Sequence, residues 1–147
     1  METIKQPDNS SSCVLACAAM ICGKTISQLE VEFGFKSTSN VCIGLKDLAN
    51  ILNFHGKFIG LFINWEHPAV IFPNQTSHLE VHCQLSEHDA ILTILGGAGS
   101  VNYHAVVWDS QSRVVRDPLP HIPETMNLEQ YAIKQWLPIT DISNTGW

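Results

Sequence analysis

The chain has 147 residues and a net charge of -6, with 8 Lys and Arg against 14 Asp and Glu. Its composition, 45% hydrophobic and 15% charged, predicts one folded domain over residues 1–147 and excludes a disordered chain. Because no block of basic residues occurs, we expect neither nucleic acid nor a membrane as a partner. The longest apolar run, residues 13–22, is too short to span a bilayer.

The amino terminus and the cysteines indicate where the chain works. Residues 1–6 contain no charged segment followed by an apolar stretch, so the sequence predicts no cleavable signal peptide. The 5 cysteines are odd in number and cluster early in the chain, which is typical of reduced thiols rather than of a disulfide framework. We therefore expect a cytoplasmic protein, or one exported without a cleavable signal peptide as a secreted effector.

The first third of the chain predicts helices. A polar loop over residues 6–12 leads into an apolar helix at 13–22, with serines as possible N-caps and Gly23 as the C-cap. A second helix is predicted over 25–34, where a capping-box pattern precedes apolar residues at helical spacing. A third begins at Leu45 and closes near Gly56.

The rest of the chain predicts an antiparallel sheet. Short apolar or β-branched runs alternate with clusters of Gly, Pro, Asn and Ser. Residues 127–136 are predicted as an amphipathic helix or as an extended cover over the sheet. Helices followed by strands predict the α+β class. The predicted strands are 57–64, 69–72, 79–85, 90–95, 104–108 and 113–116.

Cys13 is the cysteine best placed to act as a nucleophile. It lies where the polar loop meets the helix, and the positive end of a helix dipole stabilises a thiolate. Cys17 and Cys22 lie within or at the end of the same apolar helix, where small core side chains are expected. The alternative for Cys13 is likewise a free core cysteine.

A predicted hairpin supplies a base and an acid for this nucleophile. Folding the chain about a four-residue turn pairs Trp108 with Arg113, and counting outward places His104 opposite Asp117. Directly opposed side chains share a face, at a separation that lets a carboxylate orient an imidazole. This prediction depends on the strand register. Asp109 lies in the turn and is predicted to stabilise it, with the role of orienting acid as its alternative.

Gln6 completes the candidate set, because a side-chain amide ahead of the cysteine can donate to an oxyanion together with the backbone N–H of Cys13. The sequence resembles the papain-fold cysteine peptidases over residues 6–119, most closely the branch that removes double-glycine leader peptides from bacteriocins. The motifs that carry the resemblance are Gln6 ahead of Cys13, Ala16-Cys17-Ala18-Ala19-Met20, Gly44-Leu45-Lys46-Asp47-Leu48, Tyr103-His104-Ala105-Val106-Val107 and Arg116-Asp117-Pro118.

The resemblance implies a fold and a role for each site residue. Cys13 is then the nucleophile, His104 the general base, Asp117 the acid that orients it, and Gln6 the oxyanion donor. The implied papain-like fold packs N-terminal helices on a C-terminal antiparallel sheet, with the active site in the cleft between them. The chain also resembles papain-fold bacterial effectors that deamidate a glutamine of a host protein through the same thioester chemistry.

These features predict a thiol-dependent hydrolase that cleaves a peptide or amide bond in a protein or peptide substrate, with no cofactor and no metal. One alternative is a glutamine deamidase effector that acts on a host protein with the same triad. A second alternative is an inert binding module that keeps the papain fold. Such a module would usually lose the cysteine or the histidine, whereas this chain has both.

Two other motifs invite different functions. His78, His82, Cys83 and His88 form a local cluster of possible metal ligands, but two histidines four residues apart share a face only in a helix. The residues between them alternate as in a strand, so a solvated sheet face is favoured. The glycines of residues 96–99 lack the Lys-Ser/Thr of a phosphate loop, so a turn or a gating loop is expected there.

Overall fold

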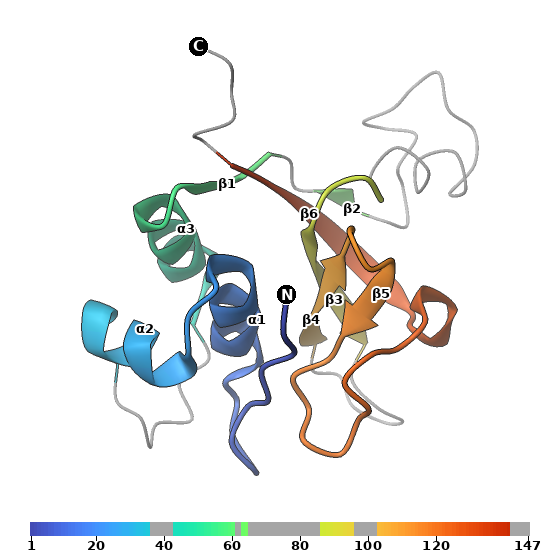
Figure 1. Ribbon diagram of the computed structural model, residues 1–147, viewed down its shortest axis with the longest axis horizontal. Coiled ribbons are helices and arrows are strands. Elements are labelled where there is room, and N and C mark those ends of the chain that lie inside the picture. Colours follow the sequence, from blue (N-terminus) through green and yellow to red (C-terminus); the bar gives the residue numbers. More distant parts are fainter. Residues whose placement is uncertain (36–42, 61–62, 65–85, 96–102, 142–147) are drawn as a thin grey trace.

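Helices and strands separate into two layers, in agreement with the predicted α+β class (Figure 1). The computed structural model describes residues 1–35, 43–60, 63–64, 86–95 and 103–141. Its elements are α1 (Cys13–Cys22), α2 (Ile26–Phe33), α3 (Leu45–Phe54), β1 (Lys57–Ile59), β2 (Ile63–Asn64), β3 (Ala90–Leu95), β4 (Tyr103–Asp109), β5 (Val114–Arg116) and β6 (Ile133–Asp141). The antiparallel sheet has the strand order β1-β6-β3-β4-β5, and β2 also pairs with β6.

Local signals place the ends of the helices. α1 ends at Gly23, whose left-handed backbone (φ 67°) lets the chain turn away. α2 begins with the predicted capping box, in which the Thr25 hydroxyl accepts the Gln28 N–H and the Gln28 side chain accepts the Thr25 N–H. α3 begins after Gly44 and ends before His55. The helices predicted for this part of the chain are therefore confirmed.

Most predicted strands that fall within the described residues also form. β3 has the predicted bounds, β4 is one residue longer than predicted at each end, and β5 begins one residue later than predicted. The strand predicted over 57–64 is divided into β1 and β2, which pair with successive parts of β6. The strands predicted over 69–72 and 79–85 lie outside the described residues.

The segment predicted as a last helix or as a cover over the sheet forms a central strand instead. Its helical part is confined to a 3₁₀ turn at Leu128–Gln130. From Ile133 onward the chain is extended, and β6 lies between β1 and β3. The helical prediction for residues 127–136 was therefore wrong. The extended alternative was right about the backbone, but the strand enters the sheet rather than covering it.

Pro138 explains why this strand was hard to recognise, because proline is usually confined to sheet edges, where it removes no ladder bond. The Ile139 N–H donates to Asp89 on the β3 side, so the missing N–H of Pro138 faces β1 and β2. On that side β1 ends at Ile59, and Gly60 lies outside the strands. The Pro138 carbonyl there accepts the Gly60 N–H at 2.9 Å. Pro138 thus occupies a position at which a central strand tolerates proline.

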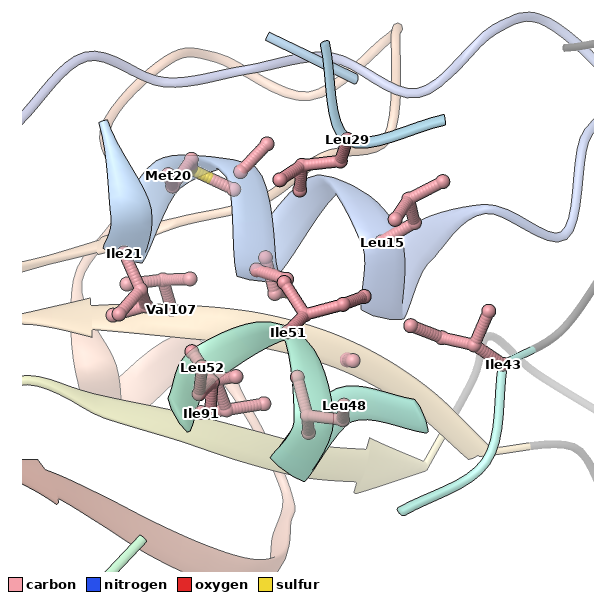
Figure 2. Close-up of a cluster of buried hydrophobic side chains, with 14 of the residues drawn as sticks. Leu15, Met20, Ile21, Leu29, Ile43, Leu48, Ile51, Leu52, Ile91 and Val107 are labelled. Atoms are coloured by element: carbon pink, nitrogen blue, oxygen red, sulfur yellow. The ribbon is translucent and has the colours of Figure 1, made fainter. Parts of the chain in front are cut away.

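Both faces of the sheet are packed, and this makes β4 a rigid support for the residues at its start. On one face, side chains of α1 and α3 meet those of β3 and β4, as Figure 2 shows for Leu15, Ile51, Ile91 and Val107. Burial of such side chains contributes about 1.5–3 kcal/mol each relative to exposure. The buried residues of the opposite face are Ala90, Leu92, Ile94, Val106, Trp108, Val115 and Trp136.

Candidate active site

Cys13 is the first residue of α1, as predicted. Ala16 and Cys17, in the next turn, are fully buried, and their small side chains allow the helix to pack closely against its neighbours. Ser12 occupies the N-cap position, where its carbonyl accepts the Ala16 N–H but its side chain forms no cap bond. The positive end of the helix dipole therefore lies at Cys13 and favours a negative charge on its sulfur.

The contacts of Cys13 favour its thiolate. Burial raises the pKa of Cys13, but a hydrogen bond with the His104 side chain opposes it. Hydrogen bonds from the backbone of Ala105 and Val14, and the positive charge of His104, lower the pKa further. Together these contacts leave the pKa of Cys13 below its ordinary value. The contacts therefore favour the thiolate although the residue is partly buried.

His104, the second residue of β4, connects Cys13 to Asp117. Its Nε2 lies 2.7 Å from Asp117 Oδ1, which leaves Nδ1 as the ring nitrogen that faces the thiol. Burial lowers the pKa of His104, but the hydrogen bonds and charges of Asp117 and Cys13 raise it to about 9. The lowered pKa of Cys13 and the raised pKa of His104 therefore favour a thiolate, an imidazolium and a carboxylate in a row.

Asp117 is buried, with 2% of its surface exposed. Burial raises its pKa, but bonds from the His104 ring, the Leu119 N–H and the Tyr131 hydroxyl keep that pKa below the ordinary value. The Lys5 ammonium donates to the backbone carbonyl of Asp117 at 2.8 Å. Sequence reasoning missed Tyr131 and Lys5, because each is a lone residue whose contact with Asp117 depends on the tertiary path of the chain.

The register predicted for the hairpin was wrong by two residues. Trp108 pairs with Val115 rather than with Arg113, so His104 is not directly opposite Asp117. Because side chains alternate with a period of two, a two-residue shift leaves both residues on the predicted face. Diagonal neighbours on one face remain within reach of long side chains, and the bond between His104 and Asp117 forms.

The turn of the hairpin explains the shift in register. Arg113 adopts a left-handed conformation (φ 59°), and its N–H donates to the Asp109 carbonyl at 2.8 Å. Arg113 therefore belongs to the turn and not to β5. The Asp109 carboxylate accepts the N–H groups of Gln111 and Ser112 and forms an ion pair with Arg116 at 2.8 Å. Its predicted role in stabilising the turn is confirmed.

Gln6 is buried, and two hydrogen bonds connect it to segments next to the other site residues. Its Nε2 donates to the Ser10 carbonyl at 2.7 Å, within the loop that precedes Cys13. Its backbone N–H donates to the Pro118 carbonyl at 2.8 Å, next to Asp117. The second Nε2 hydrogen is not used in the bond to Ser10. Among the described residues, Gln6 Oε1 has no hydrogen-bond partner.

The surroundings of the other described cysteines raise the thiol pKa instead of lowering it. Cys17 is fully buried, and burial together with the charges of Cys13 and Asp117 raises its pKa well above the ordinary value. Burial likewise raises the pKa of Cys22 to about 11. Within the described part of the chain, only Cys13 has a lowered thiol pKa. Cys17 is therefore a core side chain, as predicted, whereas Cys22 is partly buried and packs against the same core.

Two predicted motifs cannot be placed in the site. His78, His82 and Cys83 of the possible metal cluster, and the glycine loop at 96–99, lie outside the described residues. His88 is described and exposed. Over residues 1–35, 43–60, 63–64, 86–95 and 103–141, no group of three or more His, Cys, Asp or Glu side chains is arranged to bind a metal ion.

Within the described ranges, no single helix is long and apolar enough to cross a membrane. α1 and α2 reach that length only as a pair, which is bent by 98°.

The arrangement joins a thiol, an imidazole and a carboxylate in one hydrogen-bonded row, which is a pattern that nucleophilic catalysis can use. Cys13 comes from the start of a helix, His104 from the facing strand, and Asp117 from the residue after β5. Comparison of the chain with protein families, with curated proteins and with solved structures found no match. Only the geometry of the site therefore bears on its chemistry.

Proposed function

We propose that the chain is a thiol-dependent hydrolase of papain-like fold that cleaves a peptide or amide bond in a protein or peptide substrate. The observation that carries the proposal is the row formed by Cys13, His104 and Asp117, in which the thiol pKa is lowered and the imidazole pKa is raised to about 9. A cysteine that only fills the core needs no lowered pKa, and burial indeed raises the pKa of Cys17.

The proposed reaction begins with a proton already transferred from Cys13 to His104. The Cys13 thiolate attacks the amide carbonyl carbon, so a C–S bond forms and the carbonyl electron pair moves to oxygen. His104 gives its proton to the nitrogen, the C–N bond breaks, and a thioester remains on Cys13. Water then attacks the thioester carbonyl carbon while His104 accepts a proton from that water. The C–S bond breaks, which releases the carboxylic acid product and restores the Cys13 thiolate. Asp117 orients His104 throughout.

The oxyanion is assigned in this proposal to Gln6 and the Cys13 backbone N–H. For Gln6→Ala we expect turnover to fall ~10²- to 10³-fold, the usual cost of losing one oxyanion donor. Alkylation of Cys13 by iodoacetamide should keep its wild-type rate, because that reaction forms no oxyanion. The measurement is kcat beside the alkylation rate, with the exposed Gln111→Ala as control. Equal losses in both rates would assign Gln6 a structural role instead.

The proposed function is tested by a thiol-directed epoxide that reacts only with an activated cysteine. Intact-mass spectrometry of the wild-type protein should show a single adduct, and peptide mapping should place it on Cys13. An adduct on Cys17 or Cys22, or no adduct, would contradict the proposal and favour an inert binding module.

The product separates the two hydrolytic alternatives. Incubation with a cell lysate should then yield cleaved peptides if the enzyme is a peptidase. An intact partner protein about 1 Da heavier would identify a glutamine deamidase, which uses the same thioester chemistry.

A further inference from the structure

Tyr131 contacts the site from a part of the chain that the sequence did not connect with it. It follows the 3₁₀ turn Leu128–Gln130 and precedes β6. Its hydroxyl donates to Asp117 Oδ2 at 2.8 Å. The ring lies against the buried cluster of the sheet face opposite the helices, so packing as well as the hydrogen bond determines its position.

The two oxygens of the Asp117 carboxylate have different partners. Oδ1 lies 2.7 Å from His104 Nε2 and accepts the Leu119 N–H at 3.0 Å, whereas Oδ2 accepts the Tyr131 hydroxyl. Rotation of the carboxylate about the Cβ–Cγ bond would break all three of these hydrogen bonds. Since Asp117 is buried, water is poorly placed to replace them.

We propose that Tyr131 is a positioning residue, which holds the Asp117 carboxylate with Oδ1 directed at His104. This inference rests on the proposed function, because it assigns Tyr131 a role in the same row of residues. Tyr131 acts through Asp117 and touches neither the thiol nor the substrate carbonyl in this scheme.

The direction of the hydrogen bond does not change with pH in the working range. Burial and the neighbouring Asp117 carboxylate raise the pKa of Tyr131 well above its ordinary value, so the phenol keeps its proton. The pKa of Asp117 is lowered, so the carboxylate stays ionised and accepts. Tyr131 therefore remains a donor at every pH at which the thiolate and imidazolium coexist.

The test compares Tyr131→Phe with Tyr103→Phe, a control at the exposed tyrosine beside His104. For Tyr131→Phe, nuclear magnetic resonance titration should show the pKa of His104 falling from about 9 toward its ordinary value. Turnover should fall about tenfold with KM unchanged, as expected for a weakened hydrogen bond to a charged group. Tyr103→Phe should match the wild type in both measurements. A wild-type His104 pKa in Tyr131→Phe would overturn the inference.

The titration needs no substrate, so it separates this inference from the proposed function. A His104 pKa that falls in Tyr131→Phe, in a protein that hydrolyses nothing, would contradict the hydrolase and support the positioning role. Should Tyr131→Phe not fold, 3-fluorotyrosine labels the only 2 tyrosines of the chain. The fluorine signal of Tyr131 should then move in Asp117→Asn while that of Tyr103 stays. An unmoved Tyr131 signal would also overturn the inference.

Discussion

Cys13→Ala is expected to abolish hydrolysis while the fold is retained. The substitution removes the only described thiol whose pKa is lowered, so no thioester forms. Loss of a nucleophile that acts as one unit with its base typically lowers turnover on the order of 10⁵- to 10⁶-fold. Cleavage of a peptide substrate by wild type and variant, with circular dichroism to verify folding, measures the effect.

Cys22→Ala is the matched control for this experiment. Cys22 lies at the other end of the same helix, and burial raises its pKa to about 11. Its replacement should leave turnover near the wild-type value. Hydrolysis that survives in Cys13→Ala, or that disappears in Cys22→Ala instead, would show that the nucleophile is misassigned.

His104→Ala is expected to make Cys13 unreactive at mildly acidic pH. His104 supplies the hydrogen bond and the positive charge that oppose the effect of burial on the pKa of Cys13. Without them the pKa of Cys13 rises, because the effect of burial is then opposed only by the backbone hydrogen bonds of Ala105 and Val14. The thiolate fraction at pH 6 falls about tenfold for every pH unit of that rise, and we expect the rate of reaction with iodoacetamide to fall by the same factor. Replacing the exposed His121 by alanine should change nothing.

The same pair of groups determines how the wild-type reaction depends on pH. Turnover needs the imidazolium as proton donor, so it should fall as the pH rises through about 9, the pKa of His104. Alkylation needs only the thiolate and should continue above that pH. On the acid side both rates should fall as the thiolate is protonated, at a pH below the ordinary thiol range. Turnover that keeps rising above pH 9 would exclude His104 as the proton donor.

Signals confined to short stretches of sequence predicted much of the fold. The capping box of Thr25 and Gln28 and the C-cap at Gly23 act within one helical turn, so the helix bounds followed from neighbouring residues alone. The placement of Cys13 at a helix start followed in the same way. β6 was misread because Pro138 argues against a central strand, and its tolerance depends on where β1, far away in the sequence, ends.

The amino-acid sequence by itself thus predicted the described helices, the alternating faces of the strands, and Cys13, His104 and Asp117 as candidate site residues. These properties depend on periodicity and on contacts between near neighbours in the chain. The tertiary structure alone decided the hairpin register, set by the left-handed Arg113, and the contacts of Tyr131 with Asp117. The register depends on a left-handed backbone at Arg113, a conformation that is uncommon for residues other than glycine. The contact between Tyr131 and Asp117 joins residues whose proximity depends on how the sheet assembles, and no local pattern in the chain encodes it.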